Sequence, residues 1–156
     1  MKLSVVISAY NEEGRIAKVL ESVSWADEII VVDNESTDQT VTIAKSHQAR
    51  VFSQKNNLML NVNKNFGFTK ATGDWILNLD ADEVVTKKLR DEILLKINSS
   101  SVYNGYWIPR KNIIFGKWIN YGIWWPDKQL RLFKRKLGKF PCLHVHEYLS
   151  VQGSTD

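Results

Sequence analysis

The first hundred residues alternate between short apolar runs and helical patterns, and this alternation is the strongest constraint on the fold. Four runs have the composition of buried strands, at residues 3–7, 29–32, 50–52 and 75–79. Helical patterns follow them at residues 12–23, 36–46, 61–71 and 86–97. Apolar strands that alternate with helices are typical of a parallel sheet covered by helices. The sequence therefore predicts an α/β fold with a mainly parallel central sheet.

Local signals refine the helix boundaries. Ser36 and Gln39 form the ends of a capping-box pattern that is expected to open the second helix. Thr86 is expected to cap the fourth helix, and Gly73 to end the third. Lys64, in the middle of the third helix, is expected to be solvated.

The character of the chain changes near residue 100. Short aromatic strands are predicted at residues 103–108, 113–115 and 129–133, which indicates a small mixed β extension at one edge of the sheet. Nine Lys or Arg residues lie between positions 110 and 139, against a single acid, Asp127. Because 156 residues suffice for one core, we expect residues 1–156 to form a single domain whose two halves have different roles.

Composition also limits the classes of protein. No run reaches transmembrane length, and the first apolar run is too short for a signal peptide. The single cysteine, Cys142, excludes an internal disulfide and favours a reducing compartment. We therefore expect a cytoplasmic protein.

Polar residues follow three of the predicted strands, at positions 8–11, 33–36 and 80–83. In an open α/β sheet, ligands bind at the carboxyl ends of the strands. Asp80 and Asp82 are two residues apart and point the same way in extended backbone. Carboxylate oxygens suit a divalent cation that also binds phosphates. The alternative is an acidic turn before a helix N-terminus.

Two common modes of phosphate binding are absent from the sequence. The segment after the first strand, residues 8–13, lacks the Gly-x-Gly-x-x-Gly pattern, and no Walker A motif occurs. If a nucleotide binds here, its diphosphate must therefore be neutralised by a cation held on acidic residues.

Five segments carry a resemblance to known proteins. Residues 6–13 (VISAYNEE), 30–38 (IVVDNESTD) and 73–83 (GDWILNLDADE) resemble the family-2 glycosyltransferases, which have the GT-A fold. Residues 124–135 and 145–147 are similar to the branch that adds sugars to the inner core of bacterial lipopolysaccharide. The resemblance implies an inverting enzyme that transfers a sugar from a nucleotide diphosphate sugar, usually a UDP-sugar, with Mg²⁺ or Mn²⁺.

The resemblance also implies a division of labour. Residues 1–100 would bind the nucleotide sugar, and residues 101–156 would face a saccharide or glycolipid acceptor. Relatives of this branch continue past position 156, so we expect the acceptor side to be truncated. The basic second half is expected to make peripheral contact with the inner face of an anionic cytoplasmic membrane. The sequence makes no prediction of oligomeric state.

Donor-binding roles are carried over by position. Ser8, Tyr10 and Asn34 would lie near the base, with the Tyr10 ring as a stacking face, and Asp33 would face the base or ribose. Many members carry an acid where this chain has Asn34, but an amide both donates and accepts hydrogen bonds. Arg131 would hold a phosphate, or belong to a solvated face.

The metal and the base are assigned in the same way. Asp80 and Asp82 match the family's ribose and metal carboxylates, with Asp82 as the direct ligand and His146 as a third ligand. Inversion needs a carboxylate that takes the acceptor proton. Glu147 is the leading candidate, and Asp127 is the rival unless a salt bridge to Lys128 or Arg131 occupies it.

Two other functions compete with this interpretation. Asp80 would be the nucleophile of a phosphatase or phosphotransferase. Alternatively, the basic aromatic region would bind nucleic acid or another anionic surface. Under the preferred interpretation no nucleic acid is expected to bind.

Overall fold

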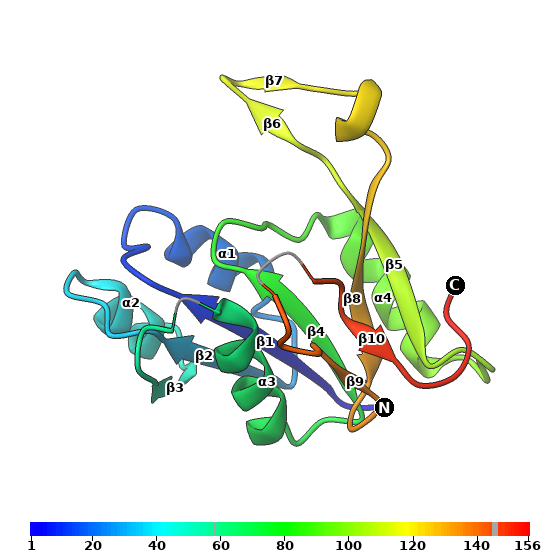
Figure 1. The fold of residues 1–156 in the computed structure, drawn as a ribbon, viewed down its shortest axis with the longest axis horizontal. Coiled ribbons are helices and arrows are strands. Elements are labelled where there is room, and N and C mark those ends of the chain that lie inside the picture. The colour runs from blue at the N-terminus through cyan, green and yellow to red at the C-terminus, as the bar shows by residue number, and fades with distance from the viewer. Residues whose placement is uncertain (58, 145–146) are drawn as a thin grey trace.

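A computed structural model describes residues 1–57, 59–144 and 147–156 and builds the chain around a six-stranded sheet, in the order β3-β2-β1-β4-β8-β5 (Figure 1). The elements of the first half are β1 (Leu3–Ala9), α1 (Ile16–Ser22), β2 (Glu28–Asp33), α2 (Thr40–Ser46), β3 (Arg50–Ser53), α3 (Leu60–Lys70), β4 (Trp75–Asp80) and α4 (Lys87–Asn98). Those of the second half are β5 (Gly105–Arg110), β6 (Ile113–Ile114), β7 (Lys117–Trp118), the 3₁₀ turn η1 (Gly122–Trp124), β8 (Asp127–Lys134), β9 (Gly138–Lys139) and β10 (Ser150–Val151).

The four strands of the first half are parallel, as predicted. β1 lies between β2 and β4, with Ala9 opposite Asp33 and Ser8 opposite Asp80. β3 pairs with the outer side of β2. The polar strand ends therefore meet at one edge of the sheet, and the prediction of an α/β fold with a mainly parallel sheet is confirmed.

The strands of the second half complete the main sheet. β8 pairs antiparallel with β4, and β5 pairs antiparallel with β8. The predicted mixed extension is thus part of the same sheet, where it covers the edge of β4 that would otherwise be unpaired. Separate two-stranded pairs are formed by β6 with β7 and by β9 with β10.

Side chains alternate between the two faces of the sheet. Val5, Ile7 and Leu77 belong to a core cluster that also takes in residues of α1, α2 and α4. Val6 and Ile76 belong to the opposite cluster, which is covered by α3 and by Phe140 and Leu149. Because both faces are covered, the central strands β1, β2 and β4 carry buried apolar residues on both faces. Within the described residues, no helix is both long and apolar enough to cross a membrane.

The helix boundaries agree with the sequence in one case and differ in another. The Thr86 hydroxyl accepts a hydrogen bond from Leu89 N at 3.2 Å and caps α4, as predicted. The predicted capping box does not form, because α2 begins only at Thr40. Ser36 Oγ instead accepts from Asn11 N at 2.9 Å and links the loops after β1 and β2.

Gly73 is needed for a close approach of two backbones. α3 already ends at Lys70, so Gly73 does not end that helix as predicted. A Cβ at position 73 would lie 2.8 Å from Ser4 N and 2.9 Å from Lys2 O. Backbone atoms cannot move aside as a flexible side chain can, so only glycine fits between α3 and β4.

We predict that Gly73→Ala lowers the free energy of unfolding by about 1–3 kcal/mol, because the start of β1 must shift. Gly14→Ala is the matched control, since a Cβ at position 14 meets nothing within 4 Å. That control should change stability by less than about 0.5 kcal/mol. Urea denaturation measures both, and equal stability of the two variants would refute the close-approach explanation.

Candidate functional site

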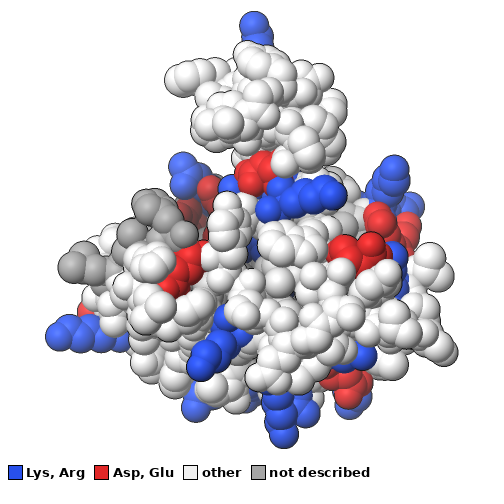
Figure 2. All heavy atoms as spheres, turned by 45° about the vertical axis from the view of Figure 1, so that its right-hand side comes forward, with Lys and Arg blue, Asp and Glu red and all other residues white. Residues whose placement is uncertain are grey.

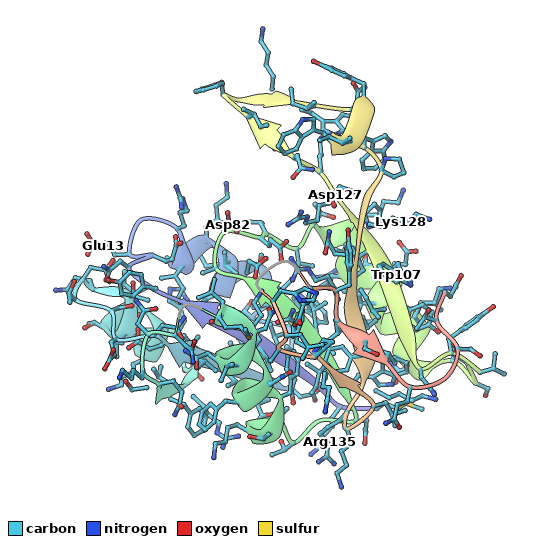
Figure 3. The ribbon with its side chains drawn as sticks, viewed as in Figure 1. Glu13, Asp82, Trp107, Asp127, Lys128 and Arg135 are labelled. Atoms are coloured by element: carbon cyan, nitrogen blue, oxygen red, sulfur yellow. The ribbon has the colours of Figure 1, made fainter. Side chains whose placement is uncertain are left out.

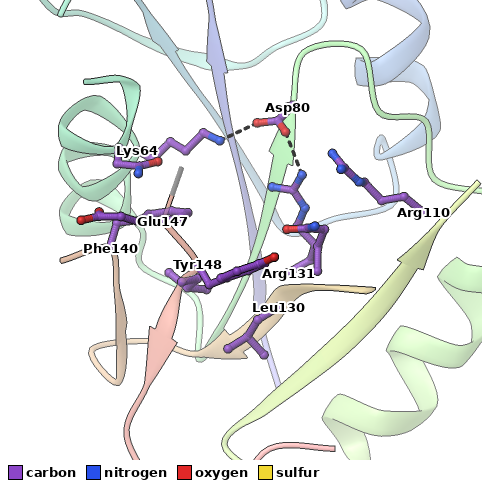
Figure 4. Close-up of a pocket in the computed structure, with 11 residues that line it drawn as sticks. Lys64, Asp80, Arg110, Leu130, Arg131, Phe140, Glu147 and Tyr148 are labelled. Carbon is purple, nitrogen blue, oxygen red and sulfur yellow. Dashed lines mark hydrogen bonds and ion pairs between the residues drawn. The ribbon is translucent and has the colours of Figure 1, made fainter. Parts of the chain in front are cut away.

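A charged cavity of about 320 Å³ lies at the carboxyl end of β4 (Figure 4). Its charged lining comes from β4, α3, β5, β8 and the segment before β10, and consists of Asp80, Lys64, Arg110, Arg131 and Glu147. The cavity therefore brings together side chains from both halves of the sequence at the edge of the sheet where a ligand was expected.

The Asp80 carboxylate lies between two cations. Lys64 Nζ is 2.6 Å from its Oδ1, and Arg131 Nη2 is 2.7 Å from its Oδ2 (Figure 4). Burial alone would raise the pKa of Asp80, but Arg131 and Lys64 together hold it well below its usual range. The Lys64 side chain is only 12% exposed, so the prediction that it is solvated is wrong.

Arg131 reaches the cavity because β8 contains a bulge. Tyr106 pairs with Leu132 and Trp107 with Leu130, which leaves Arg131 as an extra residue. Leu130 and Arg131 consequently both line the cavity although they are adjacent in the strand. Burial alone would lower the pKa of Arg131, but Asp80 and Glu83 raise it. The expectation of a solvated face at Arg131 is excluded, because the side chain is 8% exposed.

Glu83 extends this charge network and was not singled out from the sequence. Its Oε1 lies 2.6 Å from Arg131 Nη2, and its Oε2 accepts from Asp80 N at 2.9 Å. Burial raises the pKa of Glu83, Arg131 opposes this shift, and the charge of Asp80 adds to it. The turn after β4 thus brings the Glu83 carboxylate next to Arg131, which also binds Asp80.

The strand ends of β1 and β2 bring Ser8 and Asn34 together. Asn34 is buried; its Nδ2 donates to Ser8 Oγ at 3.0 Å, and its Oδ1 accepts from Asn63 Nδ2 at 2.6 Å. Asp33 is also buried and accepts from Ser36 N at 3.3 Å. Tyr10 is 46% exposed, so its ring is accessible for stacking.

The two residues expected to hold a cation, Asp80 and Asp82, would leave its further coordination positions to phosphate and water. Asp82 is exposed at the turn after β4 (Figure 3), and it makes no hydrogen bond or ion pair with the rest of the described chain. No group of three or more His, Cys, Asp or Glu residues gathers as a metal site within residues 1–57, 59–144 and 147–156. His146 lies outside these residues. Two carboxylates with oxygen donors from a nucleotide suit Mg²⁺ or Mn²⁺.

Glu147 lines the cavity, and backbone groups hold its carboxylate. It accepts hydrogen bonds from Cys142 N at 2.6 Å, from His144 N at 2.8 Å and from Leu143 N. Desolvation alone would raise the pKa of Glu147, but the three backbone donors lower it. The carboxylate therefore orders the 142–144 loop at the mouth of the cavity.

Asp127 lies at the start of β8, beside Lys128 (Figure 3). Its Oδ2 is 2.7 Å from Arg110 Nη2 and 3.2 Å from Asn112 Nδ2, and its Oδ1 accepts from Gln129 at 2.9 Å. Burial would raise the pKa of Asp127, but these donors lower it. The predicted salt bridge thus exists, but its partner is Arg110, and not Lys128 or Arg131.

Comparisons with known proteins agree on the family. A family model described as glycosyl transferase family 2 matches residues 4–148. An uncharacterized glycosyltransferase of Rickettsia typhi (strain ATCC VR-144 / Wilmington) is 48% identical over 93 residues, which cover 59% of this chain and 32% of that protein. The lipopolysaccharide core biosynthesis glycosyltransferase LpsC of Rhizobium meliloti (strain 1021) is 28% identical, over 99% of this chain and 59% of LpsC. This chain thus matches only about a third of the Rickettsia relative's length.

Solved structures share the fold. Staphylococcus aureus TarS superposes with a TM-score of 0.64 and 23% identity, over 91% of this chain and 31% of TarS. Glucosyl-3-phosphoglycerate synthase of Mycobacterium tuberculosis, solved with Mn²⁺, uridine diphosphate and glucosyl-3-phosphoglycerate, gives a TM-score of 0.57 and 26% identity. That match covers 67% of this chain and 42% of the synthase. The chain belongs to glycosyltransferase family 2 and has the GT-A fold.

Proposed function

We propose that this chain binds a nucleotide diphosphate sugar, with a UDP-sugar as the first choice, and transfers the sugar with inversion to a saccharide or glycolipid acceptor of the cell surface. The observation that carries the proposal is Asp80, held between Lys64 and Arg131 in a cavity at the carboxyl end of β4. Membership of the family supports it. So do the relative named for lipopolysaccharide core biosynthesis and the related synthase that was solved with UDP and Mn²⁺.

The donor side is assigned to the residues at the strand ends. Asp80 and Asp82 would hold Mg²⁺ or Mn²⁺, whose charge neutralises the leaving diphosphate. Lys64 and Arg131 already lie within hydrogen-bond distance of Asp80, so they can share their remaining N–H groups with a phosphate. Ser8 and Asn34 would bind the polar edge of the base, with Asp33 at the base or ribose.

The acceptor side requires a base. We assign this role to Glu147 because it lines the same cavity as Asp80, whereas Asp127 does not belong to that lining and forms an ion pair with Arg110. The three backbone donors keep Glu147 ionised and fix its orientation. In this scheme Asp127 positions Arg110, which lines the cavity.

The competing functions have less support. A phosphotransferase would use Asp80 as its nucleophile, and neither the family match nor the related synthase supports that role. A nucleic-acid-binding module would leave the acidic strand ends without a role, since they repel phosphates unless a cation is bound.

We predict that Asp82→Asn abolishes the manganese-stimulated part of UDP binding, because a diphosphate near these acids is repelled without a cation. Since Asp82 is exposed, the thermal midpoint should stay unchanged. Calorimetric titration of UDP with Mn²⁺ and with a chelator measures the effect. Equal UDP affinity of the wild type under the two conditions would rule out cation-dependent binding.

Lys64→Met should weaken UDP binding on the order of tenfold or more, because a charge-assisted hydrogen bond near the diphosphate is lost. Lys70→Met is the matched control on the same helix, since Lys70 lies over the Phe66 ring at 4.8 Å and not in the cavity. Both variants are compared by titration with UDP and Mn²⁺. Equal affinities of the two variants would remove Lys64 from the donor site.

The base assignment predicts a difference between two conservative variants. Glu147→Gln should keep donor affinity and lose about 10²–10⁴-fold in transfer rate. Because the pKa of Glu147 is lowered, the wild-type rate should fall on acidification only below the ordinary glutamate value of 4.5. Normal transfer by Glu147→Gln, together with loss of transfer in Asp127→Asn, would reverse the two roles. Transfer and UDP binding are measured separately on each variant.

A further inference from the structure

Residues 111–126, between β5 and β8, form a projection that we call the aromatic arm. It contains β6, β7 and η1 and extends away from the body of the molecule (Figures 1 and 2). None of its residues is buried. Yet nine of the sixteen are four Ile, three Trp, one Phe and one Tyr. This apolar segment thus contributes no residue to either core cluster.

The tip of the arm exposes large apolar side chains. Phe115 is 101% exposed and Ile123 90%, and Tyr121 and Ile113 are 69% and 63% exposed. Phe115 and Gly116 have φ values of 49° and 75°, as the two-residue hairpin turn between β6 and β7 requires. The turn thus holds the Phe115 side chain fully exposed, and an exposed apolar patch of this kind marks an interaction surface.

Internal contacts give the arm a defined shape. The Trp118 and Trp125 rings pack edge to face with centroids 5.4 Å apart, and Lys111 Nζ lies 4.6 Å from the Trp118 centroid. Asn112 O accepts from Ile119 N at 3.0 Å, and its Nδ2 donates to Trp124 O at 3.1 Å. The arm therefore presents its apolar tip without needing the body for support.

The charges of the arm favour one kind of partner. Its charged residues are Lys111 and Lys117, with no acid, and Arg110 and Lys128 flank it. Figure 2 shows a largely uncharged head with a basic side chain at its outer end, and both basic and acidic side chains at its neck. The nearest acid in sequence, Asp127, is paired with Arg110. Trp and Tyr beside Lys are typical of segments at the headgroup level of a bilayer, and anionic lipids attract such cations.

We propose that the aromatic arm docks this protein on an anionic membrane by inserting Phe115 and Ile123 at the boundary between headgroups and acyl chains. Residues 111–126 contain two lysines and no acid, so their charge favours anionic lipid over a protein partner. Arg110 connects the arm to the cavity, since it borders the arm and lines the cavity. Docking would thus keep the cavity near a lipid-linked acceptor, a consequence that rests on the proposed function.

The test is flotation of the 156-residue chain with vesicles, without nucleotide or acceptor. Phosphatidylglycerol–phosphatidylcholine vesicles should bind it and phosphatidylcholine vesicles should not, and binding should fall as salt rises. Phe115→Asn and Ile123→Ser should each weaken binding on the order of 10-fold or more, because an inserted apolar side chain is removed. Lys117→Gln should weaken it by about fivefold at low salt.

Asn tolerates the left-handed conformation of residue 115, and the arm has no buried residue, so circular dichroism should show an intact fold. Val102→Ser is the matched control, because Val102 is 79% exposed in a loop outside the arm, and this variant should bind vesicles like the wild type.

Equal binding of wild type and Phe115→Asn, or no binding to anionic vesicles at low salt, would overturn the proposal. So would a dimer in sedimentation velocity that Phe115→Asn dissociates without changing vesicle binding. UDP titration without vesicles tests the proposed function by itself. A failure of membrane docking can therefore be told apart from a failure of nucleotide binding.

Discussion

The Asp80 carboxylate joins three parts of the fold that are distant in sequence. Lys64 reaches it from α3 and Arg131 from β8, at 2.6 and 2.7 Å. A carboxylate that loses water needs such partners, and the removal of one partner leaves an uncompensated charge. These two ion pairs lie in the wall of the cavity. They connect the end of β4 to α3 in the first half of the chain and to β8 in the second half.

The same network continues toward the aromatic arm. Arg131 also binds Glu83, and Arg110 Nη1 lies 3.6 Å from the same Glu83 oxygen. Arg110 then pairs with Asp127 at the start of β8. Acids and cations thus alternate from α3 to the neck of the arm. A ligand that changes the charge at Asp80 acts on a connected set of side chains, because coupled buried charges respond to one another.

Much of this arrangement could be predicted from local sequence. The apolar runs that contain Val5 and Leu77 are buried on both faces of the sheet, and unbroken apolar runs of this kind indicate a parallel sheet. Since Ser8 and Asp80 each end such a run, their meeting at one edge followed from the topology. The segments that resemble family-2 glycosyltransferases led to the family that the comparisons show.

Other features depend on tertiary contacts that no local pattern encodes. Lys64 lies in an ordinary helical pattern, and its partner Asp80 is known only once α3 packs across β1 and β2. Arg131 enters the cavity through a bulge, which the sequence does not mark. The composition of the second half predicted an aromatic, basic region. It could not show that Phe133 packs in the core while Phe115 protrudes, because both lie in predicted aromatic strands close to cations.

The central claim is that the cavity at Asp80 binds a cation together with a nucleoside diphosphate. The most direct measurement is a crystal structure of this chain with UDP and Mn²⁺, in which anomalous scattering locates the manganese. We predict a manganese peak beside Asp80 or Asp82, with the diphosphate next to it and within reach of Lys64. UDP bound elsewhere on the chain, or a diphosphate in this cavity with no manganese beside these carboxylates, would contradict the claim.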